Sequence, residues 1–443
     1  MFILNKNKVS LVNILNYLIA LIPLSLILGN LAVNFNLILI IVLGFLVFGN
    51  KVFLINEKKY QFLIYAFFLY LILISTYRYF NNYDVYFTEA YFKNLIKSIL
   101  YLRFLLLFLI ISNLCEKNLL NFKIIFYVFG ILGIILSIDI LIQTIFKQNI
   151  IGYPIYNSKP SSFFGSESVA GPFLQKFCLF SIFFLIFNKK IKFLTDYKHI
   201  FFLFILFLIP IILTQNRMAI VLYILSCVIY YLFKKEIIKI FALLIFFLGI
   251  IFLTIKFPVI DRLSTQIKLF YSNSLNIIIN APELFYYNKV KGKDFIDIEI
   301  HHLYLIHLNS GVQVWKKSKL FGGGLKSFRV NCKYGDNQTC NTHPHNYFIE
   351  IMVDTGLIGL FIIYSLFFLG SLNFVKIFLK NKDKDEENIN FKLIFFLIVF
   401  IEFFPIKTSG SFFTTSNSML IYFFLAIFLN LASIKLKKNF LNQ

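Results

Sequence analysis

Long apolar stretches recur along almost the whole chain, and they constrain its fold more than any other feature. A membrane-spanning helix needs about 20 predominantly apolar residues, and soluble proteins have no need for such stretches repeatedly. The sequence therefore predicts an all-α, polytopic membrane protein with about 12 transmembrane helices. They are expected at residues 11–29, 31–48, 60–77, 95–112, 122–146, 169–187, 199–213, 218–233, 237–255, 347–368, 391–405 and 417–432.

The composition supports a membrane protein and excludes several soluble classes. Of the 443 residues, 59% are hydrophobic and only 14% are charged. A soluble domain has roughly 45–50% apolar residues and about 25% charged ones. A water-soluble fold would have to expose this apolar excess. An ordinary cytosolic enzyme, a secreted disulfide scaffold and a disordered chain are therefore excluded.

The formal net charge of +22 divides unevenly between the two sides of the expected topology. With 12 spans, both termini and most of the loop lysines lie on one side, which the positive-inside rule identifies as the cytoplasm. The charge thus follows from topology and from a bias toward Lys, and no nucleic-acid partner is needed to explain it. Five basic residues are Arg, and none lies on the expected cytoplasmic side: Arg78, Arg103, Arg217, Arg262 and Arg329.

The chain is expected to divide into three parts. Residues 1–256 would form transmembrane helices one to nine, residues 257–345 one large, mainly helical outer loop, and residues 346–443 the last three helices. A loop of this length far exceeds an ordinary connection. It contains the only Trp and five of the six His residues, of which His301, His302 and His307 are expected at its surface.

Cys332 and Cys340 share the outer loop, with seven residues between them. The envelope side of the membrane is oxidising, which favours a disulfide between the two. Two free thiols remain the alternative. A zinc site with His343 and His345 is less favoured, because no further ligands with defined spacing accompany them and no metal is expected.

His345 follows Pro344 at the expected start of the tenth span, at the boundary between membrane and water. Asn346 can cap this helix by accepting the free N–H groups of its first turn. An imidazole suits general-base chemistry near neutral pH, and the positive end of a helix would help to keep it neutral. The alternative is an interfacial histidine that anchors the helix.

These residues carry a resemblance to a known family. His345-Asn346 is followed, after nine residues, by Gly356-Leu-Ile-Gly359, which resembles the signature of the O-antigen ligase family. This superfamily also includes O-antigen polymerases and protein O-oligosaccharyltransferases. Three further segments resemble the family: 161–171 before the sixth span, the glycine-rich 321–329, and 404–413 between the last two spans.

The resemblance implies a reaction and its partners. A glycan would pass from undecaprenyl diphosphate to an acceptor hydroxyl on the periplasmic face of a bacterial inner membrane. The acceptor is a lipid A-core sugar for a ligase, or a second lipid-linked glycan for a polymerase. The resemblance implies an inverting, metal-independent glycosyltransferase without a cofactor, with His345 as the base and the outer loop in the periplasm.

The same resemblance suggests residues that bind substrate. Arg217 and Arg262 stand where the family has functional arginines, and a guanidinium can bind phosphate oxygens in a bidentate way. Arg329, Asn346 and Lys159 are further candidates, although related chains tend to carry Arg at the position of Lys159. For each arginine the alternative is a boundary cation that snorkels to water.

Two further hypotheses concern the charged residues within the spans and a different class of protein. Asp139 and Lys176 could pair or line the donor groove, although structural ion pairs are the favoured interpretation. A polysaccharide transporter is the distant alternative. Transporters tend to place broken helices and polar groups near the membrane midplane, whereas the candidate groups here lie at the outer boundary.

Overall fold

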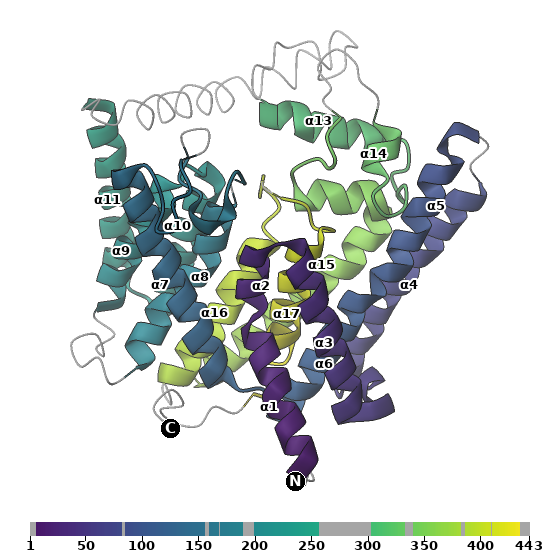
Figure 1. Ribbon diagram of the computed structural model, residues 1–443, viewed down its shortest axis with the longest axis horizontal. Helices are drawn as coiled ribbons and strands as arrows, with labels where there is room; N and C mark the ends of the chain where they lie inside the picture. The colour runs from purple at the N-terminus through teal and green to yellow at the C-terminus, as the bar shows by residue number, and fades with distance from the viewer. Residues whose placement is uncertain are drawn as a thin grey trace.

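The structure is a computed structural model, and it describes residues 6–81, 85–155, 159–167, 169–188, 199–256, 303–332, 340–381, 386–408 and 410–434. The described residues form helices joined by turns, with an isolated β-bridge between Gln148 and Pro154 (Figure 1). This confirms the predicted all-α fold. The helices are α1 (Lys6–Ala20), α2 (Ile22–Leu28), α3 (Asn30–Phe48), η1 (Gly49–Phe53), α4 (Lys58–Phe80), α5 (Val85–Leu100), α6 (Leu102–Glu116), α7 (Phe122–Phe146), η2 (Ser162–Phe164), α8 (Ala170–Phe187), α9 (Ile200–Leu213), α10 (Arg217–Lys234), α11 (Ile237–Lys256), α13 (Leu303–Lys316), α14 (Phe328–Asn331), α15 (Tyr347–Asn381), α16 (Glu386–Glu402) and α17 (Thr415–Leu429).

Seven helical stretches in the described part of the chain are long and apolar enough to cross a membrane. An eighth results if α1 and α2, which meet at an angle of 47°, count as one broken span. The helices α9 and α17 and the stretch Ile237–Phe246 are apolar but shorter. A helix lies at each of the twelve predicted segments, yet the length criterion supports a smaller number of spans.

The centre of the bundle is formed by α8, α16 and α17. Most of the side chains of these three helices are buried. The ring of Phe180 on α8 lies 5.7 Å from that of Phe395 on α16 and 5.9 Å from that of Phe424 on α17. Aromatic rings at such distances pack favourably edge to face or offset. Much of the abundant phenylalanine therefore builds the contacts between the central helices.

Outer helices differ from the central ones because one face of each is exposed. On α4, Phe62, Leu69 and Leu73 are exposed while Ile64, Phe67 and Leu71 are fully buried. Large apolar side chains on an exposed helix face are expected where a helix meets lipid. The apolar surplus of the sequence is thus divided between a packed interior and an apolar outer surface.

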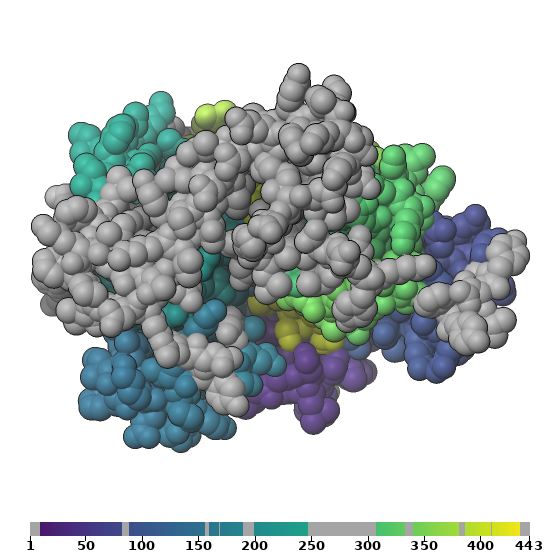
Figure 2. Space-filling model, turned by 90° about the horizontal axis from the view of Figure 1, so that it is seen from above, coloured from purple at the N-terminus to yellow at the C-terminus, as the bar shows by residue number. Residues whose placement is uncertain are grey.

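The helix α13 lies across the first turns of α15, at one end of the bundle (Figure 1). A small apolar cluster joins them, with Val314 on α13, Phe328 on α14, and Ile349 and Val353 on α15. Seen from above, the chain around α13 and α15 lies beside the α4–α5 pair (Figure 2). This packing fixes the segment that carries His345.

Candidate active site

His345 lies directly before α15, in a backbone conformation that few side chains adopt. Its φ is +54°, in the left-handed region, where His is more frequent than most residues. The next residue, Asn346, caps the helix: its Oδ1 accepts the N–H of Ile349 at 2.9 Å. Its Nδ2 donates to the carbonyl of Pro405 at 2.9 Å. Because both ends of the buried Asn346 amide bind protein, this residue positions His345.

Three imidazoles gather around the start of α15. The ring of His345 lies 4.2 Å from that of His343 and 4.8 Å from that of His307 on α13. The Nδ2 atom of Asn341 lies 3.2 Å from Nε2 of His307 and 3.5 Å from Nε2 of His345. The prediction that His307 lies at the surface is wrong, because its side chain is only 4% exposed. His301 and His302 lie outside the described residues.

The surroundings of His345 keep its ring neutral. Burial, and secondly the neighbouring His343, lower the pKa of His345 from 6.5 to about 4. Burial also lowers the pKa values of His343 and His307. Burial disfavours the charged form of a base. A neutral imidazole has a lone pair that can accept a proton, and the 3.5 Å contact from Asn341 occupies it only weakly.

The glycine motif that follows His345 has a structural explanation. Gly356 interrupts α15 with φ +64° and ψ −169°. The loop before α14 passes this break, where Gly323 and Gly324 donate to the carbonyls of Val353 and Asp354 at 2.9 Å each. A Cβ atom on Gly356 would collide with the carbonyl of Leu320. The two glycine-rich segments therefore interlock, and the backbone groups freed at the break find partners.

Two buried carboxylates hold the same loop onto α15. Asp354 accepts the backbone N–H groups of Lys326 and Ser327 at 2.8 and 3.0 Å. Glu350 accepts the hydroxyl of Ser411 at 2.6 Å and the N–H of Phe412 at 2.6 Å. The Nζ atom of Lys326 lies 3.3 Å from Glu350. The segments 321–329 and 404–413 are thus fastened to the helix that begins after His345.

A second cluster of buried charged side chains, Glu402 with Lys176 and Lys407, lies next to the start of α15. Glu402 binds Lys176 at 2.7 Å and Lys407 at 2.6 Å, and all three side chains are almost fully buried. The Nζ atom of Lys407 lies 4.0 Å from the centre of the Tyr347 ring. Lys176 therefore takes part in a structural ion pair, as the favoured interpretation predicts, but its partner is Glu402 and not Asp139. Asp139 instead accepts the N–H of Ile150 and the hydroxyl of Ser162, and it thereby anchors the loop after α7.

Three of the four cationic side chains that are predicted to bind substrate lie within the described residues. Arg217 is half-buried and is the first residue of α10. The residue before it, Asn216, caps this helix by accepting the N–H of Ala219 at 3.2 Å. Arg329 is exposed, and its Nε donates to the carbonyl of Thr342, three residues before His345, at 3.0 Å. Lys159 is half-buried. Arg262 lies outside the described residues.

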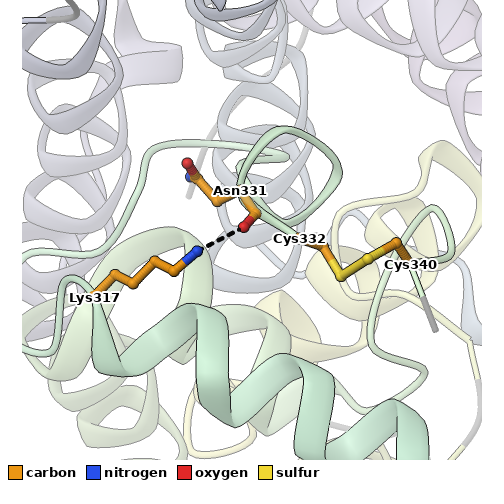
Figure 3. Close-up of a disulfide and its surroundings, with 4 residues drawn as sticks. All are labelled: Lys317, Asn331, Cys332 and Cys340. Atoms are coloured by element: carbon orange, nitrogen blue, oxygen red, sulfur yellow. Dashed lines mark hydrogen bonds between the residues drawn. A yellow bond between two sulfur atoms is a disulfide. The ribbon is translucent and has the colours of Figure 1, made fainter. Parts of the chain in front are cut away.

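Cys332 and Cys340 form a disulfide (Figure 3). It joins the end of α14 to the segment that leads through Asn341 to His345. Both sulfur atoms are engaged, so they are not ligands for a zinc ion with His343 and His345. Among the described residues, no group of three or more His, Cys, Asp or Glu side chains, the three neighbouring imidazoles included, has an arrangement that could hold a metal ion.

The fold and the site define a class of protein: a multi-pass helical membrane protein with a neutral histidine at the start of a broken helix. Residues 202–364 match the family model for O-antigen ligase. The match runs from α9 to the middle of α15 and includes Arg217, His345 and Gly356. This match, which covers part of the chain, supports the O-antigen ligase family that the sequence motifs predict. A comparison with curated proteins finds no match.

Several residues of the site could not be identified in the sequence. His307 approaches His345 only because α13 crosses α15, and Gly311 permits that crossing. A Cβ atom on Gly311 would lie 2.9 Å from Cβ of Pro344 and would collide with Ile349. The periodic apolar residues of 301–319 predict a helix, but they do not indicate what it packs against.

Proposed function

We propose that the protein transfers a glycan from undecaprenyl diphosphate to an acceptor hydroxyl on the periplasmic face of a bacterial inner membrane. Ligation of O-antigen to lipid A-core is the favoured form of this reaction. The carrying observation is the neutral, half-buried His345 at the start of α15, inside the segment that matches the O-antigen ligase family. A base in this state can accept the proton that an acceptor hydroxyl must lose.

In the proposed step, the acceptor hydroxyl loses its proton to Nε2 of His345. Its oxygen then attacks the anomeric carbon of the donor sugar. The bond from that carbon to the diphosphate oxygen breaks, and undecaprenyl diphosphate leaves with the bonding electrons. Attack opposite to the leaving group inverts the anomeric centre. A diphosphate is already a good leaving group, so the proposal needs no cofactor.

Cations would bind the donor diphosphate. We assign this role to Arg217 and Arg262, because one guanidinium group can bind two phosphate oxygens at the same time. Lys159 would contribute a further positive charge. Arg329 is bonded to Thr342 next to the histidine cluster, so we propose that it contacts the acceptor side of the site or holds the Thr342 segment in place. Asn346 would orient His345 through the helix cap.

A polymerase that joins lipid-linked repeats is the alternative within the same class. It uses the same base and the same donor, and only the acceptor differs. A polysaccharide transporter is less favoured, because the buried histidine cluster lies at one end of the bundle. Both termini are proposed to be cytoplasmic, with the site facing the periplasm among the surrounding membrane lipids.

The choice of acceptor is tested with purified protein and an undecaprenyl-diphosphate glycan. One reaction receives lipid A-core and the other receives only additional lipid-linked glycan. A single transfer to lipid A-core supports a ligase, whereas a ladder of products without lipid A-core identifies a polymerase. The absence of product in both reactions, with binding of the donor retained, would contradict the proposed transfer.

A further inference from the structure

A pocket lies at the same end of the molecule as His345, but it does not include this histidine. It has a volume of about 210 Å³ and is formed where α4, α5, α13 and α14 meet. Its polar lining includes Arg78, Tyr91, Lys317, Ser318 and Asn331. We propose that this pocket binds an anionic group of a saccharide, a phosphate or a carboxylate, and so forms a subsite for the acceptor glycan. This inference rests on the proposed function.

The positive charge of the pocket is held in place by neutral groups. Arg78 donates from Nε and Nη2 to the carbonyl of Gly322 at 3.0 and 2.7 Å, and from Nη2 to the hydroxyl of Ser318 at 2.5 Å. Lys317 donates to the carbonyl of Asn331 at 3.0 Å. Within the described residues neither cation pairs with a carboxylate, so two positive charges are available to an anion.

The remaining lining suits a sugar better than a small ion. The hydroxyl of Tyr91 donates to Oδ1 of Asn331 at 2.9 Å, which orients the Asn331 amide. Val314 and Val353 add apolar surface. A water molecule requires only about 10–15 Å³ of such space, so this pocket can accommodate a much larger group. Apolar walls with a few oriented polar groups are typical of small-molecule sites.

The pocket is separated from the reacting centre by the length of α13. His307, beside His345, and Lys317 are ten residues apart, which corresponds to about 15 Å along a helix. A group bound in the pocket is therefore not the reacting hydroxyl, but it can belong to the same oligosaccharide. The disulfide connects the two places, because Cys332 follows Asn331 and Cys340 precedes Asn341 (Figure 3).

The test measures binding, so that it does not depend on transfer. The full-length protein in nanodiscs of zwitterionic lipid is titrated calorimetrically with glucose 6-phosphate, glucuronate and glucose. The two charged sugars should bind, and glucose should bind at least about tenfold more weakly. The variant Lys317→Gln should lose about tenfold in affinity for the charged sugars, as expected for one charge-assisted hydrogen bond. Asn331→Asp, which introduces a negative charge, should lose more.

Lys319→Gln is the matched control, because it removes the same charge from an exposed lysine outside the pocket. Its affinity should remain within about twofold of the wild type. Equal losses in Lys317→Gln and Lys319→Gln, or equal binding of glucose, would overturn the proposal. So would nanodiscs with anionic lipid that abolish sugar-phosphate binding, because the pocket would then be a lipid headgroup site. Failure of glycan transfer leaves these binding results unaffected, so the two proposals fail separately.

Discussion

At the scale of single residues, the environment of His345 favours the neutral imidazole that the proposed base requires. Its pKa is lowered mainly by burial, with His343 as the second cause. The start of α15 contributes the cap by Asn346, which holds the backbone next to His345 in place. The position of His345 therefore depends on Asn346, whereas its protonation state depends on burial and on His343.

The lowered pKa of His345 predicts the pH dependence of catalysis. The neutral, active form predominates above a pKa of about 4, so kcat/KM should be constant from about pH 7 down to about pH 5 and fall below that. The measurement is kcat/KM for the free enzyme across this range, with donor binding followed in parallel as a control. A decline that begins near the ordinary histidine pKa of about 6.5 would show that the base is an unperturbed histidine.

The buried ion group below α15 should be essential to stability. Glu402→Gln would leave Lys176 and Lys407 without their shared carboxylate, at a cost of about 3–5 kcal/mol. Glu386→Gln on the same helix is the control, because Glu386 is exposed and its pair with Lys234 should contribute about 1 kcal/mol or less. Unfolding in mixed micelles measures both variants, and equal free energies of unfolding would refute this view of Glu402.

At the scale of helices, the break in α15 allows the glycine-rich segment 321–329 to pack against the glycine motif at 356–359. The helical hydrogen bonding is interrupted at Gly356, and the loop at 319–324 supplies partners for the backbone on both sides of the break. In the described structure the glycines therefore have an architectural role: they allow the loop at 319–324 to pack against the helix that follows His345.

Gly356→Ala should destabilise the protein more than a positive φ alone can explain. The new Cβ would meet the backbone of Leu320, which cannot move aside as a flexible side chain could. Gly49→Ala provides the comparison, since Gly49 has φ +55° and no atom lies within 4 Å of the place that an added Cβ would take. We expect about 1 kcal/mol for Gly49→Ala and about 3 kcal/mol or more for Gly356→Ala, measured as free energies of unfolding. Similar values for both would contradict the interlocked arrangement.

The disulfide should support both the stability of the outer segment and the activity of His345. By the loop-entropy relation, closing a loop of about nine residues contributes about 2–3 kcal/mol. The double variant Cys332→Ser/Cys340→Ser should lose this stability and transfer more slowly, because Asn341 and His345 follow the second cysteine. Cys115→Ser, at a buried free cysteine, controls for the substitution itself. An unchanged transfer rate in the double variant would separate the disulfide from the site.

At the scale of the whole molecule, the sequence predicts the elements well and their contacts poorly. Apolar stretches of spanning length indicate the helices, and His345-Asn346 with its glycines indicates the family, because these signals are local. The crossing of α13 over α15 is not local, so the sequence gives no sign that His307 will lie beside His345. The same holds for Lys176 and Glu402, which are 226 residues apart and yet form a buried pair.

The positions of the basic residues behind the net charge of +22 are likewise explained only by the folded chain. Lys176 and Lys407 are used in the interior, Lys326 fastens a loop, and Arg78 and Lys317 line a pocket. Composition can suggest that most lysines set the topology. It cannot identify the few that bind a carboxylate or line a pocket, since those positions depend on distant segments.

The most direct test of the account is a single-turnover measurement of glycan transfer by His345→Ala with saturating donor and acceptor. Removal of a general base should slow transfer by about 10²- to 10⁴-fold while donor affinity remains at the wild-type value. His343→Ala, two residues earlier, should cause a much smaller loss. Transfer by His345→Ala at the wild-type rate would show that His345 is not the base and would contradict the proposed mechanism.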